Sequence, residues 1–218
     1  MADIAECSTD KAQIHTNLPA SDESFQSGRP APTQSLVEAL HTAGSDLSGF
    51  AGAILLAAML GRNLEHMHRI SVDDNEGDLN GKYWTRHRDI DNILLNLTMG
   101  MPEALRIPQG LPDPNVIFMN MCVHTSVICL HQSAMSRADK HQLTGSISAE
   151  SKMRCITAAL EIASIMRAIA HLDLATVMIY TLPTKVYTTD SIPDELFHVV
   201  LSLRRSSRFH SVPACSTQ

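Results

Sequence analysis

The chain has 218 residues, of which 44% are hydrophobic and 4% aromatic, and its net charge is -6. This length and apolar share are enough for one domain with a sizeable core. The acidic balance is not that of a protein that binds nucleic acid through bulk charge, since such a protein presents a basic face. The longest apolar run, residues 50–60, is much shorter than the roughly 20 residues of a membrane span, so we expect no membrane association.

The N-terminal segment, residues 1–34, is rich in Ser, Asp, Pro and Thr and poor in large apolar side chains. We predict disorder there, because such a composition buries too little apolar surface to offset the chain entropy. The first helix is predicted at about 45–69, with Ser45 or Asp46 as its cap. Gly49, Gly52 and Gly61 weaken this helix, although small residues of this kind can instead permit a close helix contact. Its apolar face follows steps of three and four and comprises Leu47, Phe50, Ala51, Ile54, Leu55 and Ala58.

An acidic loop at 73–81 precedes the second predicted helix. Its acidic residues are Asp73, Asp74, Glu76 and Asp78. We interpret them as a solvated loop rather than an activation patch, because no aromatic residues are interleaved with them. The second helix is predicted at about 82–99 and ends before Pro102. Its face follows steps of four and three and comprises Tyr83, His87, Ile90, Leu94, Leu97 and Met101.

A Pro-punctuated connection, residues 102–113, leads to the third predicted helix. Asp113 and Pro114 form a favourable start, since Asp caps a helix and Pro is well tolerated at its first position. Residues 116–130 are apolar nearly all round, which is typical of a central helix that is covered on several sides. The polar stretch 136–147 is predicted to end it.

The fourth helix is predicted at about 148–171, with Ser148 as its cap and Glu150 in its first turn. Its apolar face comprises Cys155, Ala158, Ile162, Ile165, Ile169 and Leu172. No segment alternates convincingly as several strands would, so we predict an all-α fold, a bundle or array with about four main helices. The pattern then degrades, and residues 176–218 are predicted to be an irregular tail that becomes basic and Ser-rich from Leu203.

No reactive residue has partners at a spacing that indicates an active site. The triplet His87-Arg88-Asp89 is similar to a kinase catalytic loop, but Leu94 stands where that motif has Asn. Cys155 lies on the predicted apolar face, which favours a buried, inert thiol over a nucleophile. We therefore predict that the chain is not an enzyme and assign no catalytic residue.

One string of residues has the types that bind metals: Cys122, His124, Cys129 and His131. On a helix its two cysteines lie seven residues apart, as do its two histidines, which is roughly 10 Å along the axis and too far for one zinc ion. We interpret these residues as core positions. His87 and Asp91 lie four apart, but two ligands do not make a site, and a local polar pair is favoured. We assign no metal site and no cofactor, and the sequence identifies no cofactor-binding residues.

The cysteines are odd in number and widely spaced: Cys7, Cys122, Cys129, Cys155 and Cys215. That pattern favours a reducing compartment over a disulfide scaffold. Arg204, Arg205 and Arg208 are interpreted as a solvated tail rather than a nuclear-import or phosphate-binding patch.

Three stretches, 83–108, 115–140 and 150–173, carry motifs of a known family. The motifs are a Trp-containing helix leading to a Pro-x-x-Leu-x-x-Pro turn, an Asn-x3-His-x3-Ile-x-Leu-His helix and a Glu-Ser-x-x-Arg-Cys-x-x-Ala-Ala-x-x-Ile helix. The matching residues here are Trp84, Pro102, Leu105, Pro108, Asn120, His124, Ile128, Leu130, His131, Ser151, Arg154, Cys155, Ala158, Ala159 and Ile162. Over roughly 47–175 the chain resembles the regulatory, or middle homology, region of fungal zinc binuclear cluster transcription factors, a xylanolytic-activator-like regulatory domain.

The resemblance implies an all-helical regulatory domain at 35–175, in a nuclear protein that modulates transcription by protein contact or ligand sensing. Its implied partners are the transcription machinery or a full-length relative, together with a small-molecule effector. Family members bind DNA through six cysteines that hold two zinc ions. This sequence has only Cys7 before the helices, so we expect DNA contact only indirectly or in a longer parent.

The match fades after Asp173, so we expect the domain to be incomplete. A shortened gene product or a faulty gene model would account for that. The alternative to a regulatory domain is a helical interaction scaffold or dominant-negative fragment. It would associate with a full-length relative through exposed apolar faces.

Overall fold

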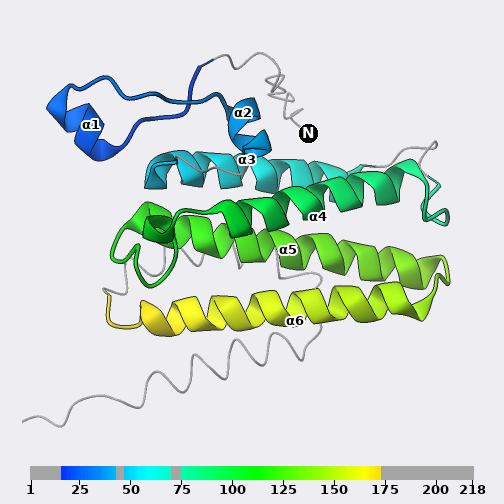
Figure 1. The fold of residues 1–218 in the computed structure, drawn as a ribbon. Helices are drawn as coiled ribbons and strands as arrows, with labels where there is room; N and C mark the ends of the chain where they lie inside the picture. Colours follow the sequence, from blue (N-terminus) through cyan, green and yellow to red (C-terminus); the bar gives the residue numbers. More distant parts are fainter. Residues whose placement is uncertain (1–15, 43–46, 70–74, 173–218) are drawn as a thin grey trace, which may run out of the picture.

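The structure is a computed structural model that describes residues 16–42, 47–69 and 75–172. Its helices, shown in Figure 1, are α1 (Asp22–Ser27), α2 (Leu36–His41), α3 (Gly49–His68), α4 (Lys82–Gly100), the short 3-10 helix η2 (Glu103–Leu105), α5 (Pro114–Lys140) and α6 (Gly145–Ala168). Within these ranges there is no β-strand, and only an isolated bridge pairs Asn17 with Ser35. The predicted all-α fold with four main helices is confirmed.

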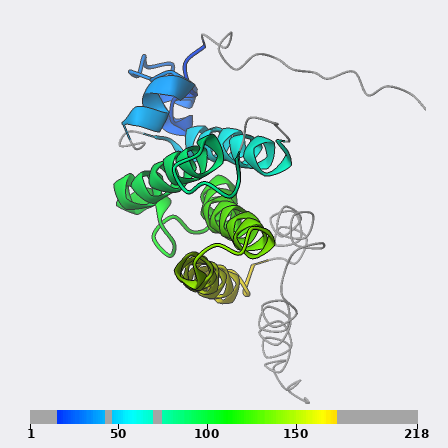
Figure 2. The same ribbon diagram turned by 90° about the vertical axis from the view of Figure 1, so that its right-hand side faces the viewer.

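Helix α5 is the central element of the fold. It packs against α3, α4 and α6, and Figure 2 shows α6 on the opposite side of α5 from α3. Two of the three apolar clusters of the described residues lie one on each side of α5. The first includes Leu55, Met59, Leu94, Val116 and Leu130, and the second includes Ile117, Met121, Ile128, Ala158 and Ile162. The prediction of a central third helix is confirmed.

Helix α3 begins after Ser48, whose Oγ accepts a hydrogen bond from the N–H of Ala51 at 3.1 Å. The predicted caps, Ser45 and Asp46, lie outside the described residues. Phe50 was predicted to face the core but is 50% exposed. The prediction was wrong there because the buried face is centred further along, on Gly52, Leu55, Leu56, Met59, Asn63 and His66. A Cβ at Gly52 would overlap Sδ of Met119, so the close helix contact is confirmed.

All six residues of the predicted face of α4 are buried, and the last of them, Met101, is the C-cap of the helix. The connection that follows is fixed at both ends. Arg106 donates to the carbonyls of Met101 (2.9 Å) and Met99 (2.8 Å), which satisfies acceptors that the end of α4 leaves open. The amide of Asn120 on α5 donates to the carbonyl of Leu105 at 2.8 Å. The turn between α4 and α5 is thereby tied to both helices.

Helix α5 is longer than the predicted apolar segment. Asp113 caps it as predicted, since its Oδ1 accepts from the N–H of Asn115 at 2.8 Å. The helix continues through polar residues to Lys140, where Arg137 and Lys140 in the last turn suit the helix dipole. The prediction that the helix ends in the polar stretch 136–147 is confirmed, since the last helical residue lies inside that stretch.

Helix α6 begins three residues before its predicted start. Thr144 is the N-cap, without a side-chain hydrogen bond. Ser148 does not cap the helix as predicted, because it lies inside and its hydroxyl donates to Asp139 at 3.2 Å. The predicted apolar face is correct, with Cys155, Ala158, Ile162, Ile165 and Ile169 buried.

Residues 16–35 run along the beginning of α3. The N–H of Leu18 donates to the carbonyl of Gln34 at 2.8 Å, and the hydroxyl of Ser48 donates to the carbonyl of Pro19 at 3.2 Å. Part of the segment predicted to be disordered therefore forms hydrogen-bonded structure. The side chain of Leu18 in this part is buried, which offsets some of the entropy lost on ordering the chain. Residues 1–15 and the predicted tail 176–218 lie outside the described residues. No described helix has the length and hydropathy that a bilayer crossing requires.

Candidate functional site

A set of polar side chains joins α4, α5 and α6; we call Asp91, His131, Ser151 and Arg154 the polar cluster. His131 of α5 lies at its centre, with Nε2 at 3.3 Å from Oδ1 of Asp91 and Nδ1 at 3.3 Å from Oγ of Ser151. Arg154 of α6 donates to the other oxygen of Asp91 at 3.4 Å. One carboxylate from α4 therefore holds side chains of both other helices.

The carboxylate of Asp91 is ionised at neutral pH. Burial alone would raise its pKa, but the hydrogen bond and charge of His131 and the charge of Arg154 outweigh burial and hold the pKa below the ordinary value. The side chains of Asp91 and Arg154 are 21% and 39% exposed, so water screens part of their attraction. The cluster is consequently a positioning device more than a large source of electrostatic energy.

A row of aromatic rings connects the polar cluster to α3. The ring of His87 lies edge-on to His131 at 5.3 Å and to Trp84 at 5.6 Å, while His66 stacks on Tyr83 at 4.5 Å. Burial, assisted by the neighbouring His131 and His66, lowers the pKa of His87 to about 3. Nδ1 of His87 is buried without a hydrogen-bond partner, so the neutral ring acts as a packing element.

Glu76 anchors the loop before α4 to the end of α5. Its carboxylate accepts from Arg137 at 2.9 Å and from Lys140 at 3.2 Å, and it lies 3.1 Å from Nε2 of His141. Burial opposes ionisation, but the hydrogen bonds from His141, Arg137 and Lys140 outweigh it and lower the pKa of Glu76 to about 2. The interpretation of this loop as merely solvated was wrong for Glu76. Its sequence neighbours Asp73 and Asp74 lie outside the described residues.

Arg137 is the residue that joins this anchor to the aromatic row. Its guanidinium lies 4.5 Å from the centre of the Tyr83 ring and donates to the carbonyl of Met67 at 2.9 Å. The indole N–H of Trp84 donates to the backbone carbonyl of Glu76 at 2.8 Å. The loop, α3, α4 and α5 thus meet around one arginine.

The predicted metal-type string does not converge in the structure. Among the described residues, no group of three or more His, Cys, Asp or Glu could hold a metal ion. Burial raises the pKa of Cys122 and Cys155 to about 12 and that of Cys129 to about 11. Partial burial lowers the pKa of His124 to about 4. Such thiols carry almost no thiolate at neutral pH, which is the chemistry of core residues.

Cys155 and Asp91 each have contacts that the sequence did not specify. The thiol of Cys155 donates to the carbonyl of Ile128 at 3.7 Å, so it faces α5. Asp91 was predicted to form a local pair with His87, but its carboxylate bonds His131 and Arg154 instead. The i, i+4 spacing places the side chains of His87 and Asp91 near each other. The hydrogen-bond partners of the Asp91 carboxylate nevertheless come from the neighbouring helices α5 and α6.

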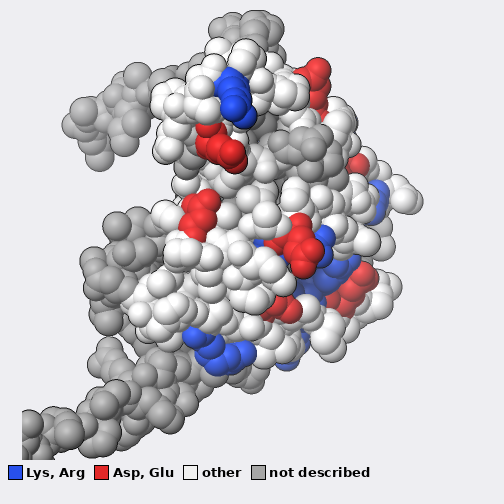
Figure 3. Space-filling view, turned by 60° about the vertical axis from the view of Figure 1, so that its left-hand side comes forward, with Lys and Arg blue, Asp and Glu red and all other residues white. Residues whose placement is uncertain are grey.

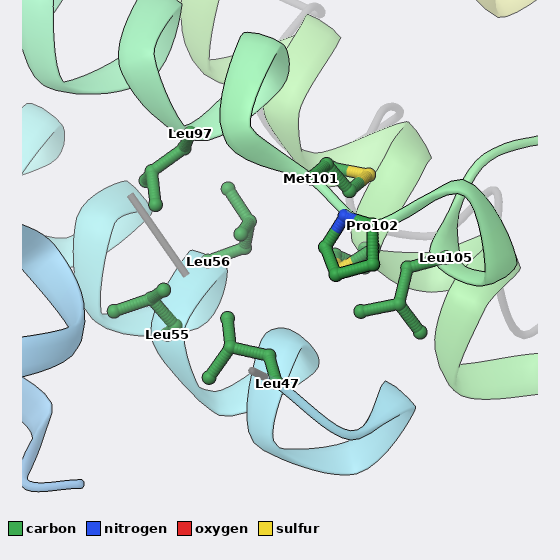
Figure 4. Close-up of a pocket in the computed structure, with 8 residues that line it drawn as sticks. Leu47, Leu55, Leu56, Leu97, Met101, Pro102 and Leu105 are labelled. Carbon is green, nitrogen blue, oxygen red and sulfur yellow. The ribbon is translucent and has the colours of Figure 1, made fainter. Parts of the chain in front are cut away.

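Figure 4 shows apolar side chains of α3, α4 and η2 around a small pocket. The pocket has a volume of about 10 Å³, which is barely the space of one water molecule. A second cavity, between residues 18–34 and the start of α3, measures about 180 Å³. Pockets for small molecules usually measure roughly 300–1,000 Å³. Neither cavity has the size of a typical effector site.

Charged side chains are interspersed on the face shown in Figure 3. Blue and red groups alternate there, and most of that surface is uncharged. A phosphate-binding face would require a continuous basic area. The charges on this face do not form such a continuous basic area.

The residues that carry the family resemblance lie at contacts between helices. His131, Ser151 and Arg154 meet in the polar cluster. Asn120 ties the η2 turn to α5. Ile128, Ala158 and Ile162 form the apolar contact between α5 and α6, and Trp84 closes the loop onto α4. The sequence patterns did not single out Arg137, and they assigned Asp91 to a local pair and Glu76 to a solvated loop, because only the packed helices bring these charges together.

The unfolding free energy is expected to fall as the pH drops from about 6.5 to 4.5. The pKa of His87 is about 3 in the folded chain and ordinarily 6.5, so the unfolded state binds the extra proton in this window and stability decreases. The groups acting on His87 are His131, His66, Asp91 and Arg88. Urea titrations of His87→Phe, read by circular dichroism, should lose about 1 kcal/mol per pH unit of this slope.

The control for this prediction is a titration below pH 4.5. There the carboxyl of Glu76, whose pKa is about 2 in the folded chain and ordinarily 4.5, binds protons in the unfolded state first, so its contribution is lost in both proteins as the pH falls toward 2. His124 adds to the slope in the upper window and is unchanged in the variant. An identical slope in wild type and His87→Phe between pH 6.5 and 4.5 would contradict the assignment of a neutral, buried His87.

Comparison with known proteins identifies relatives of one kind. The chain is similar to the azaphilone cluster-specific transcription factor azaR of Aspergillus niger, at 35% identity over 152 residues, 62% of this chain and 31% of the relative. It is 28% identical to the pigment biosynthesis transcriptional activator pigB of Monascus ruber, over 70% of this chain and 28% of the relative. It is 32% identical to the citrinin biosynthesis transcriptional activator ctnR of Monascus purpureus, over 56% of this chain and 22% of the relative.

The chain thus covers less than a third of the length of each of these relatives. No family model matches the chain, and no solved structure matches it. The relatives are named transcription factors or activators and not enzymes, in agreement with the prediction that this chain is not an enzyme. The resemblance drawn from the three sequence motifs is confirmed: the chain is homologous to part of the fungal pathway-specific transcription factors.

Proposed function

We propose that residues 47–172 are a regulatory region that modulates transcription in the nucleus by contact with other proteins. The relatives support a role in transcription, because all those compared are transcription factors or activators. The proposed mechanism, contact with other proteins, rests on the position of the motif residues in the fold. These residues take part in the contacts that join α4, α5 and α6. The joined helices present a surface of fixed shape and not a reactive site.

Two further observations favour protein contact over the other mechanisms considered. The described cavities are smaller than typical effector pockets, which disfavours ligand sensing at those places. Three of the five cysteines are buried in α5 and α6, and a two-zinc cluster takes six cysteines. We therefore attribute no direct DNA contact to this stretch and propose that DNA is reached through a partner or a longer parent.

The proposal is tested by tethering the whole chain to a heterologous DNA-binding domain beside a reporter gene in a fungal host. The expected result is a reporter output that differs from that of the DNA-binding domain alone. The variant Asp91→Leu should return the output to the baseline, because it disrupts the contact between α4, α5 and α6. The exposed neighbour Asp89→Leu is the matched control and should keep the effect.

Immunoblots must show equal amounts of the three fusions. A wild-type fusion that leaves the reporter at the baseline would count against a regulatory role for this region. An Asp91→Leu fusion as active as the wild type would count against the helical surface as the carrier of that role.

A further inference from the structure

A short segment covers the outer side of α3 and α4; we call residues 16–42 the N-terminal strap. Its helix α2 packs against both α3 and α4, and Figures 1 and 2 show it on the side of α3 that faces away from α5. The residues of α2 that join the apolar core are Leu36, Ala39 and Leu40. They stand at positions i, i+3 and i+4, which lie on one face of a helix. The strap therefore packs a short amphipathic helix onto the bundle.

Ala39 is the residue of α2 that is buried most completely. Its side chain is 0% exposed, whereas Val37 of the same helix is 55% exposed. Complete burial of so small a side chain indicates that the backbone of α2 lies close to the helices beneath it. Ala39 belongs to the same apolar cluster as Leu55 of α3 and Leu94 of α4. The surface under α2 is thus apolar and accommodates a small residue between two aliphatic ones.

The strap is held to the bundle mainly by these apolar contacts. Among the described residues, one hydrogen bond joins the strap to the bundle, from the hydroxyl of Ser48 to the carbonyl of Pro19 at 3.2 Å. The N–H of Leu18 bonds within the strap, to the carbonyl of Gln34 at 2.8 Å. A cavity of about 180 Å³ remains between the strap and the start of α3. A segment with so few contacts can open at a lower free energy than the bundle needs to unfold.

Helix α2 has the features of a peptide that binds a protein surface as a helix. Such peptides place aliphatic residues at i, i+3 and i+4 on an apolar surface of the protein that binds them. Here the helix belongs to the same chain, since α2 ends at His41 and α3 begins at Gly49. A helix tethered this closely competes with a free one at an effective concentration that is roughly millimolar.

We propose that the surface of α3 and α4 beneath α2 binds an amphipathic helix of a partner protein, and that α2 occupies this surface as an internal competitor. The partner helix carries aliphatic residues at i and i+4 and a small residue at i+3. This inference rests on the proposed function, contact with other proteins, and gives that contact a place and a partner chemistry. The apparent affinity for the partner is reduced by the fraction of chains in which α2 covers the surface.

Fluorescence anisotropy with a labelled peptide of residues 16–42 tests the proposal on the full chain. The variant Ala39→Asp places a carboxylate on the buried side of α2 and should release α2 from the surface. We expect this variant to bind the peptide about tenfold more tightly than the wild-type chain, or better, because its internal competitor is removed. Val37→Asp changes an exposed residue of the same helix and, as the matched control, should bind the peptide as weakly as the wild type.

A second peptide tests whether the pattern is recognised apart from the rest of the strap. It keeps only Leu-x-x-Ala-Leu in a helix otherwise composed of Glu, Lys and Gln. We expect it to bind the Ala39→Asp chain and to displace the labelled strap peptide. A version with both leucines replaced by lysine should do neither. Failure of the first version to displace the strap peptide would overturn recognition of a partner helix.

Circular dichroism and urea unfolding check that the Ala39→Asp chain keeps its bundle. If it does not fold, the milder pair Leu36→Ala with Leu40→Ala takes its place. A folded, released chain that binds the strap peptide no better than the wild type would overturn the proposal. Dimers formed by exchange of α2 between two chains would assign the surface to a second copy, which also overturns it.

The reporter assay separates this proposal from the proposed function. A chain that binds both peptides but leaves the reporter at the baseline would keep the helix-binding surface without a role in transcription. A chain that changes the reporter output but binds neither peptide after release of α2 would overturn the surface alone.

Discussion

The substitution Trp84→Ala is expected to cost about 3–5 kcal/mol of unfolding free energy. Trp84 is buried, its indole lies edge-on to Tyr83 at 5.1 Å, and its N–H donates to the carbonyl of Glu76 at 2.8 Å. Removing the indole opens a cavity where the loop, α4 and α5 meet and leaves a carbonyl without its donor. Urea unfolding followed by circular dichroism measures the loss, which is a large share of the roughly 5–15 kcal/mol of a typical domain.

Two variants separate the causes of this loss. Trp84→Phe keeps most of the apolar volume but removes the N–H, so it should cost about 1–2 kcal/mol. Met99→Ala removes an exposed side chain of the same helix and should change the stability by less than about 0.5 kcal/mol. A cost below about 1 kcal/mol for Trp84→Ala would show that the indole does not fill the space in which the structure places it.

The substitution Asp91→Leu is expected to destabilise the chain by about 2–3 kcal/mol. It removes the acceptor of both His131 and Arg154, and His131 is buried, so its Nε2 loses the partner that compensates burial. The value lies below that for a fully buried ion pair because Asp91 and Arg154 are partly exposed. Thermal unfolding should show a midpoint lower by roughly 4–12 °C for a chain of this size.

Two matched control variants each differ from Asp91→Leu in one feature. Asp91→Asn retains an oxygen that can accept one hydrogen bond and should cost less than Asp91→Leu, about 1 kcal/mol. Asp89→Leu changes an exposed carboxylate two positions away and should lie within about 0.5 kcal/mol of the wild type. If Asp89→Leu were as costly as Asp91→Leu, the loss would reflect the helix surface and not the polar cluster.

The faces of α4 and α6 could be predicted from the sequence because their apolar residues repeat cleanly. Tyr83, Ile90 and Leu94 on α4, like Cys155 and Ile162 on α6, step by three and four without interruption, and all are buried. On α3 nearly every position is apolar or small, so the pattern does not distinguish neighbouring faces. The prediction there included Phe50 and omitted Asn63, whose amide donates to the carbonyl of Ser126 at 2.7 Å.

The polar contacts could not be predicted, because they join residues far apart in the sequence. Glu76 and Arg137 lie on different elements, and each looks like an ordinary solvated charge when taken alone. The predicted start of α6 was wrong for a related reason. Ser148 was a plausible cap by residue type, but the sequence does not show that its hydroxyl has a partner in Asp139 on α5. Local patterns specify helices, and packing decides which polar groups meet.

A double-mutant cycle between Asp91→Leu and His131→Leu tests most directly whether His131, a residue of the family motif, joins α5 to α4. The two side chains come from α4 and α5 and lie 3.3 Å apart. We expect a coupling free energy of about 1–2 kcal/mol, because the double variant removes both partners and leaves fewer buried groups unsatisfied than the two single variants imply. Costs that add to within about 0.3 kcal/mol would contradict this coupling and show that His131 does not join α5 to α4.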